Sequence, residues 1–280
     1  TLVGGNLFYY DNPVDYNNDG FTDFALNKKA VLFTKTKIKG WKIFSKGYWE
    51  DRWGGQTNWS EEYRGGDSIY AESVITRRVE TIVSNNFQLK ASKYSFTASF
   101  SSHFQDAAYG TTLLKARETI GFSQFMRYKR YGIHQTLGGI TLKIQDYTDN
   151  TPVKFQNRTS FIPGIFFQDK IDFSERNTSQ LGMRLDYHSF HGLIFSPRIN
   201  HKVQFNNRLS LRLNAGTGFR VVNVFTEDHA ALTGARNVII KESLKPEKSY
   251  NFSMLLEQFT ELPQGFLKFS FSPFYTLLYQ

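Results

Sequence analysis

The chain has no cysteine and no long apolar run, and each absence excludes a class of structure. Without cysteine there is neither a disulfide framework nor a thiolate metal site. Nowhere do 18 apolar residues follow one another, which excludes a transmembrane helix. No clustered basic stripe is present, so we expect no nucleic-acid partner. Motifs for a nucleophile elbow, a P-loop, a zinc protease or a dinucleotide fingerprint are also missing, and we expect a protein that is not an enzyme.

Aromatic residues are abundant, with 27 Phe, 15 Tyr and 4 Trp among 280 residues, yet the mean hydropathy is negative at -0.43. Many aromatics without an apolar block suit a membrane β-barrel, whose strands turn one face to lipid and the other to water. A soluble β-sandwich gives a similar average, so composition leaves both open. The net charge of +9 fits an anionic substrate or neighbouring lipopolysaccharide, and equally a solvated surface with scattered Lys and Arg.

The dominant period of the hydrophobic pattern is two, which is typical of strands with one apolar and one polar face. Clear alternation occurs in residues 96–104, 195–205, 209–215 and 267–272, with His201 as an exception on the apolar side. The expected strands are long, at about 14 residues or more in residues 67–83, 86–104 and 245–259. Strands of soluble proteins usually have about 3–10 residues, so this length favours a barrel.

Turn signals and polar segments divide the chain into long hairpins. Short turns are expected at Lys39-Gly40, Ser84-Asn85-Asn86, residues 129–132, Glu175-Arg176-Asn177, Asn206-Asn207 and Leu262-Pro263-Gln264. Longer polar segments are expected at residues 53–66, 105–112, 146–159 and 218–243. Short turns at one end and long loops at the other are typical of outer-membrane barrels. We therefore predict an all-β, antiparallel transmembrane β-barrel of roughly 12 long strands without a helix of any length.

Two motifs lie within residues 210–251. Gly216, Gly218, Phe219 and Arg220 match G-x-G-F/W-R, and Leu244, Pro246, Glu247, Ser249 and Asn251 match L-x-P-E-x-(S/W)-x-N. With strand alternation on both sides, this region resembles TonB-dependent outer-membrane receptors. In that family the first motif ends a strand, a long external loop follows, and the second motif opens the next strand. Further segments that look like this family, particularly its Bacteroidota-type branch, are residues 15–29, 68–78 and 196–203.

The resemblance implies active import of a bulky, scarce nutrient across the outer membrane of a Gram-negative bacterium. It implies a barrel of about 22 strands closed by a separate plug, with the TonB–ExbB–ExbD complex as partner and membrane lipid and lipopolysaccharide as neighbours. A ferric siderophore-type chelate is the first expectation for the nutrient, and haem, cobalamin or a glycan are alternatives. A passive porin or adhesin barrel and a soluble secreted carbohydrate-binding β-sandwich are the rival classes.

Residues 1–280 are expected to form only part of such a barrel. The sequence begins without Met or signal peptide and shows neither a plug nor a TonB box, so we expect a fragment that starts inside the mature protein. Roughly half a barrel has two open edges, which lipid cannot satisfy. We therefore expect that this piece alone would not insert and fold.

The candidate ligand contacts lie in the expected outer loops. Arg and Trp suit a ferric chelate of anionic or catechol character, by charge and by stacking. The same side chains could equally stabilise the loops. The candidates are Arg52, Trp53, Trp59, Arg220, Glu227, Asp228, His229 and Arg236.

Six histidines raise the question of metal or haem binding. His229 lies in the long loop, where haem receptors of the family carry a histidine flanked by F-R-A-P and N-P-x-L. Here the first motif reads F-R-V-V from Phe219, and the second is missing, which makes haem a minority interpretation. His188 and His191 are three residues apart, so in one strand they would point to opposite faces.

One acidic loop suggests a cation site. Its pattern D-x-N-x-D-G-x-x-D is the first part of a Ca²⁺ loop, in which hard oxygen ligands alternate around a sharp glycine turn. However, Leu26 occupies the place of the final bidentate acid, and Asn, Asp and Gly also simply form turns. Ca²⁺ is the only cofactor that we consider; its ligands would be Asp15, Asn17, Asp19 and Asp23.

Overall fold

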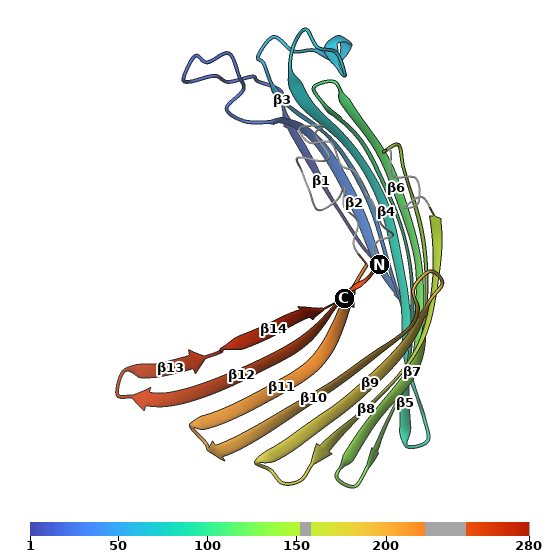
Figure 1. Ribbon diagram of the computed structural model, residues 1–280, viewed down its shortest axis with the longest axis vertical. Helices are drawn as coiled ribbons and strands as arrows, with labels where there is room; N and C mark the ends of the chain where they lie inside the picture. The colour runs from blue at the N-terminus through green and yellow to red at the C-terminus, as the bar shows by residue number, and fades with distance from the viewer. Residues whose placement is uncertain (152–157, 222–244, 280) are drawn as a thin grey trace.

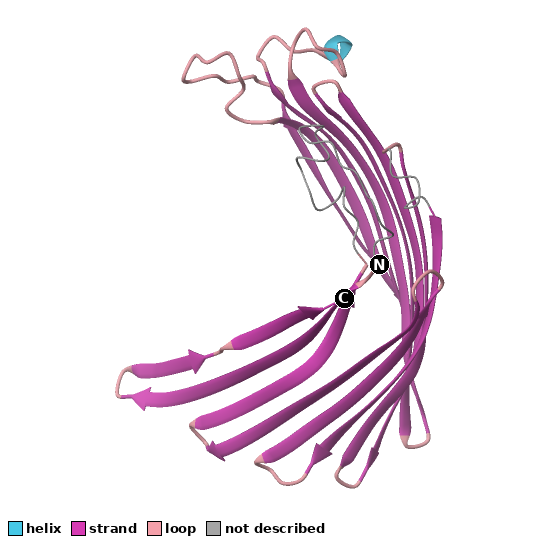
Figure 2. Ribbon diagram, viewed as in Figure 1, coloured by secondary structure: helices cyan, strands magenta, loops and turns pink. Residues whose placement is uncertain are grey.

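The computed structural model describes residues 1–151, 158–221 and 245–279. These residues form a single antiparallel sheet of 14 strands (Figures 1 and 2). Apart from the strands, the described residues contain one short 3-10 helix, η1 (Glu61–Tyr63). No helix in the described part of the chain is long and apolar enough to cross a membrane.

The strands follow one another across the sheet in chain order from β1 to β13. β14 pairs with β12, as β13 does, and Ser272 and Pro273 separate these last two strands. The bounds are β1 (Leu2–Tyr10), β2 (Leu26–Ile38), β3 (Trp41–Gly55), β4 (Ala71–Leu89), β5 (Ser92–Tyr109), β6 (Thr112–Tyr131), β7 (His134–Asp149), β8 (Arg158–Asp172), β9 (Asn177–His188), β10 (Gly192–Asn206), β11 (Leu209–Arg220), β12 (Glu247–Leu262), β13 (Gly265–Phe271) and β14 (Phe274–Tyr279).

The sheet is one strongly curved layer with open edges (Figure 1). β1 forms one edge, and β13 with β14 forms the other. The prediction of an all-β antiparallel fold is confirmed, and the described residues form 14 strands where roughly 12 were expected.

One face of the sheet is apolar. The strand register aligns Ile140, Ile165, Leu185 and Phe195 in a row across β7 to β10. These side chains are not covered by other parts of the described chain, since Ile140 and Phe195 are each 59% exposed. We call this side the apolar face. It contains His201, as the alternation predicted, and the His201 ring nitrogen Nδ1 lies 2.8 Å from the Ser179 hydroxyl.

The opposite face is polar. Gln135, Lys170, Gln180, Asn200 and Asn214 are register partners in a row across β7 to β11. We call this side the polar face. Because side chains alternate along every strand, the period of two in the sequence produces both faces at once.

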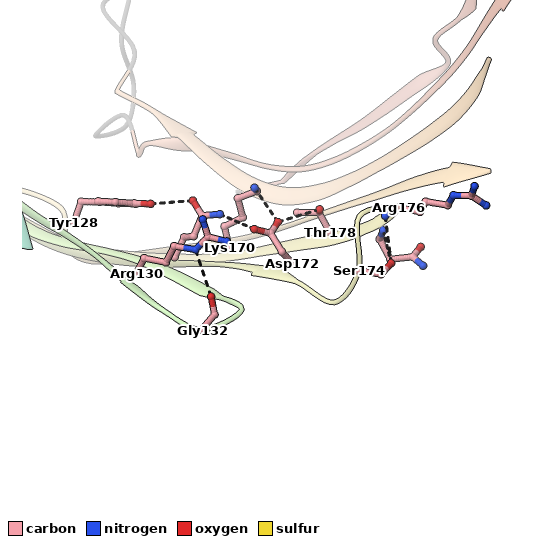
Figure 3. Close-up of polar contacts among 10 residues, drawn as sticks. Tyr128, Arg130, Gly132, Lys170, Asp172, Ser174, Arg176 and Thr178 are labelled. Atoms are coloured by element: carbon pink, nitrogen blue, oxygen red, sulfur yellow. Dashed lines mark hydrogen bonds and ion pairs between the residues drawn. The ribbon is translucent and has the colours of Figure 1, made fainter. Parts of the chain in front are cut away.

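Polar side chains also link neighbouring strands on this face (Figure 3). The Asp172 carboxylate pairs with the Lys170 ammonium at 2.9 Å and accepts hydrogen bonds from Gln135 at 2.6 Å and Thr178 at 3.2 Å. The Tyr128 hydroxyl in turn donates to Gln135 at 3.0 Å. This network joins β6, β7, β8 and β9.

The two ends of the sheet differ in their connections. Residues 11–25, 56–70, 150–157 and 221–246 connect strands at one end, which we call the loop end. The other end, which we call the turn end, has short connections such as Lys39-Gly40. Two loop-end connections are also short, namely residues 110–111 and 189–191.

The prediction of a turn at Ser84-Asn85-Asn86 is wrong, because β4 continues to Leu89. The hairpin closes at Lys90, which adopts a positive φ of 51°. Phe87 and Tyr94, stacked with ring centroids 5.3 Å apart, hold the two strands together beyond the asparagines.

The prediction of a long polar segment at residues 105–112 is also wrong. β5 extends to Tyr109 and turns tightly at Gly110, which has φ 55°. Ala107, Tyr109 and Leu114 form a small buried cluster there, and Val74 packs against it. Burial of these apolar side chains favours the continued hairpin over a loop.

Candidate ligand-binding site

A pocket of about 430 Å³ lies on the polar face near the loop end of β7, β8 and β9. We call it the polar-face pocket. It is lined by Lys143, Gln145 and Tyr147 of β7, Arg158, Ser160 and Ile162 of β8, Arg184, Asp186 and His188 of β9, and by Phe122, Phe219 and Val221.

Strand geometry brings these residues together. Residues at alternate positions share a face, so each of the three strands contributes a short column of side chains. The register then aligns the columns, pairing Lys143 with Ile162 and Tyr147 with Arg158. Residues more than 40 positions apart in the sequence therefore meet in one place.

An arginine–aspartate pair forms the floor of the pocket. Arg184 donates from Nε to Asp186 Oδ2 and from Nη2 to Asp186 Oδ1, both at 2.7 Å, and Nη2 also donates to Thr141 Oγ1 at 2.8 Å. Asp186 is only 2% exposed. Gly164 lies between Thr141 and Asp186 in the register, and a Cβ there would clash with the Asp186 carboxylate. The charge of Arg184 is thus neutralised locally.

Some cations of the polar face are held in ion pairs, and Lys143 and Arg158 are among the described ones that are not. Lys170 pairs with Asp172, and Arg78 pairs with Glu80 at 2.8 Å. Among the described residues, no carboxylate forms an ion pair with Lys143 or Arg158. The Arg158 guanidinium instead lies over the Phe190 ring, 3.8 Å from its centroid. The pocket therefore presents two positive charges beside aromatic rings.

Two histidines lie at the loop end of the pocket. The rings of His188 and His191 are 4.6 Å apart, and His188 is only 3% exposed. The prediction that they point to opposite faces is wrong, because the chain reverses between them at the β9–β10 turn. His191 Nε2 is buried without a hydrogen-bond partner among the described residues. Burial, with a smaller effect of the Arg158 charge, lowers the pKa of His191 and favours its neutral form.

The upper part of β11 closes the pocket. The ladder between β10 and β11 ends at the pair Arg198 and Gly216, whereas β11 stays paired with β12 as far as Arg220 and Glu247. The freed segment places Phe219 against the pocket. Arg220 donates from Nη2 to Glu247 Oε2 at 2.7 Å and from Nε at 3.1 Å, and so joins the two sequence motifs directly.

The sequence-predicted ligand contacts lie in several places. Arg52 is exposed on the polar face at the loop end of β3. The rings of Trp53 and Trp59 are tilted by 40° with centroids 4.7 Å apart, and Trp59 is only 8% exposed, so these rings pack against each other and not in the polar-face pocket. Arg220 pairs with Glu247. Glu227, Asp228, His229 and Arg236 lie outside the described residues. A ligand role for all of them stays a prediction.

The acidic loop binds its own backbone. Asp15 accepts from the amides of Asp19 at 3.2 Å and Gly20 at 2.9 Å, and Asp23 accepts from the Tyr16 amide at 2.7 Å. Asn17 also contacts Asp19. Within the described ranges, no three or more His, Cys, Asp or Glu side chains are grouped to hold a metal ion. Ca²⁺ binding by this loop stays a prediction.

Five residues of the polar-face pocket were not predicted from the sequence, namely Lys143, Arg158, Arg184, Asp186 and His188. Each occupies an ordinary polar position of an alternating strand, whereas the predicted ligand contacts were residues of the expected loops. One feature could have identified Lys143 and Arg158: each is a cation near the loop end of its strand, and its register partner on the neighbouring strand is not acidic. That feature requires the register, which the sequence pattern does not specify by itself.

Comparison with known proteins identifies the fold. Residues 1–278 match the family described as TonB dependent receptor-like, beta-barrel. No curated protein matches the sequence. The siderophore receptor PirA of Acinetobacter baumannii is 11% identical with a TM-score of 0.57, covering 84% of this chain and 41% of that one. The ferric enterobactin receptor of Pseudomonas aeruginosa is 11% identical with a TM-score of 0.58, and the match covers 88% of this chain and 42% of that one. The copper transporter OprC is 10% identical with a TM-score of 0.61, and the match covers 99% of this chain and 49% of that one.

This chain spans less than half the length of each of these three structures. At such low identity, the likeness shows a common fold alone. The family match extends over nearly the whole chain and agrees with the long antiparallel strands and the two-faced sheet. The chain therefore belongs to the β-barrel family of TonB-dependent receptors, proteins of the Gram-negative outer membrane.

Proposed function

We propose that this chain is part of a receptor that imports an anionic ferric siderophore-type chelate by TonB-dependent transport. The observation that carries the proposal is the pair Lys143 and Arg158, which have no carboxylate partner among the described residues and lie beside aromatic rings. A catecholate chelate presents negative charge and flat rings. Guanidinium and aromatic groups bind such ligands by charge and stacking.

In this proposal the apolar face contacts lipid and the polar face lines the lumen, as in other barrels of this kind. The polar-face pocket then lies toward the external side, because long loops are extracellular in such barrels. Arg52, together with Glu227, Asp228, His229 and Arg236, would add external ligand contacts. A plug domain and the TonB–ExbB–ExbD complex would supply the coupling to energy. The Bacteroidota-type branch stays a prediction.

The test is the double substitution Lys143→Gln and Arg158→Gln in the full-length receptor, with uptake of radiolabelled iron bound to a catecholate chelate. Losing two charge-assisted contacts should raise the half-saturating concentration by about tenfold or more. The matched control is Lys170→Gln, which removes a cation from the same face at the turn end of β8, where Asp172 pairs with it (Figure 3). The control should keep normal uptake.

Uptake that is unchanged in the double variant would contradict the proposal. So would an equal loss in the control variant, because it would indicate a general effect of charge in the lumen. Abundance in the outer membrane gives independent information. A rise of the full-length protein in iron-starved cells over iron-replete cells is expected for an iron receptor, and no response would shift the assignment to another nutrient.

Haem is the second candidate. The observation that favours it is the pair of close histidine rings, since a neutral imidazole is the usual nitrogen ligand for metals. If haem is the ligand, His188→Ala should abolish growth on haem as the iron source and leave growth on ferric chelates intact. The Lys143→Gln and Arg158→Gln variant should then show the weaker defect. No arrangement in the described part of the chain singles out cobalamin or a glycan.

A further inference from the structure

Two arginines lie on the apolar face near the loop end. The register aligns Trp49, Arg77, Phe104 and Arg117 in one row across β3, β4, β5 and β6, so that Phe104 lies between the two arginines. This row borders a hollow of about 1130 Å³ in the same face. Gly47 and Val79, one step further from the loop end, also line it.

Neither Arg77 nor Arg117 forms an ion pair or a side-chain hydrogen bond with another described residue. The next row toward the loop end carries Lys28, Asp51, Asp106 and Lys115, and three of these four charged side chains form ion pairs with described residues. There the Asp106 carboxylate pairs with Arg64 at 2.8 Å and with Lys115 at 3.7 Å, and Lys28 pairs with Asp11 at 3.7 Å. The charges of Arg77 and Arg117 are therefore available to a group outside the described chain.

The row marks a border on the apolar face. Between it and Arg127 near the turn end, the apolar-face positions of β3 to β6 hold only uncharged side chains. Trp49, which is 37% exposed, lies in the same row. Tryptophan is enriched at the boundary between hydrocarbon and headgroups, and the apolar band of a barrel ends there. Because the long loops are external, this boundary is the headgroup level of the outer leaflet.

The spacing suits one phosphate. Neighbouring strands are about 4.8 Å apart, so Arg77 and Arg117, two strands from each other, have backbones about 10 Å apart. Both guanidinium groups can converge on an anion between them, and a guanidinium fork matches phosphate in bidentate geometry. Gly47, where an added Cβ would meet no atom within 4 Å, leaves open space beneath for acyl chains.

We propose that Arg77 and Arg117 bind the phosphorylated headgroup of an outer-leaflet lipid, with its acyl chains in the hollow beside Val79 and Gly47. Basic residues at a membrane boundary recognise anionic lipid headgroups in this way. The proposal rests on the outer-membrane placement of the family and does not depend on which nutrient the receptor transports.

The test uses the full-length receptor in detergent and native mass spectrometry with two probes, diphosphorylated lipid A and its fully dephosphorylated form. The wild-type receptor should retain the diphosphorylated form about tenfold or more better. The double variant Arg77→Gln and Arg117→Gln should lose this preference. Arg212→Gln, an arginine of the polar face that lies 3.9 Å from Glu257, is the matched control and should keep it.

Equal retention of the two probes by the wild-type receptor would overturn the proposal, and this comparison requires no variant to fold. An unchanged preference in a folded double variant, or in both single variants, would also overturn it. A protein subunit found bound over Arg77 and Arg117 in stoichiometric amount would assign the hollow to a protein partner and thereby refute the lipid site.

Discussion

Gly164→Ala provides the sharpest test of the structure around the polar-face pocket. The added methyl group would clash with Asp186 Oδ1 and come within 2.9 Å of Thr141 Oγ1 and 3.0 Å of Arg184 Nη2. These three atoms belong to the same hydrogen-bond network, so they cannot all move away without breaking it. The glycine is required here for space, since its φ is not in the left-handed region.

The expected cost follows from two contributions. Overpacking a filled site costs about 1–3 kcal/mol. Separating the buried Asp186 carboxylate from its partner costs about 3–5 kcal/mol when the whole pair is buried. Here the Arg184 side chain is 38% exposed, so water compensates part of that loss. Because the contributions overlap, we expect Gly164→Ala to lower the free energy of unfolding by about 2–4 kcal/mol.

The measurement is urea-induced unfolding of the full-length receptor refolded in lipid vesicles. Gly121→Ala is the matched control, because it places the same methyl group in β6, two strands away from β8, where no atom lies within 4 Å. The control should change the free energy of unfolding by less than about 1 kcal/mol. Adding Asp186→Ala to Gly164→Ala should recover part of the loss. If Gly164→Ala and Gly121→Ala lowered the free energy of unfolding equally, the tight packing around Gly164 would be refuted.

Three further predictions concern the loop end. Arg220→Ala removes an exposed ion pair with Glu247 and should cost less than about 1 kcal/mol, so a large loss of uptake at unchanged stability would assign Arg220 to the ligand. The pKa of His191 in the folded protein lies below its usual 6.5. The free energy of unfolding should therefore be highest above pH 6.5 and fall as the pH drops from 6.5 toward the lowered pKa, because the unfolded state binds the proton more tightly. Urea titrations at several pH values should show this slope, and His191→Asn should reduce it. Asp19→Ala should weaken Ca²⁺ binding measured by calorimetry on the full receptor, and an unchanged affinity would remove the site.

The faces of the sheet were predictable because they depend on a property of the backbone. Alternate side chains must lie on opposite sides of a strand, so the pattern in residues 195–205 determines which residues share a face. The ends of strands were less predictable. Asn85 and Asn86 have the composition of a turn, yet the stacked pair Phe87 and Tyr94 extends the hairpin past them. Contacts between strands thus overrode the local preference for a turn.

The site was predictable only in its general chemistry. Arginine and aromatic residues were expected to bind an anionic chelate, and the pocket contains both kinds of residue. Their positions were not predicted, because Lys143, Arg158 and Arg184 differ from other polar strand residues only in what lies beside them. A sequence pattern assigns a side chain to a face but gives no neighbours across the sheet, and the compensation of charge depends on those neighbours.

The G-x-G-F-R motif has a physical explanation in the path of β11. A Cβ at Gly216 would lie 3.1 Å from Arg198 Cβ and 3.3 Å from the Pro197 carbonyl, so glycine allows close approach at the last pair of the β10–β11 ladder. Pro197 has no N–H to donate, and the ladder ends next to it. Beyond Gly216, β11 is no longer paired with β10, and its residue Phe219 lines the polar-face pocket. The G-x-G-F-R motif thus also determines where the upper part of β11 lines the polar-face pocket.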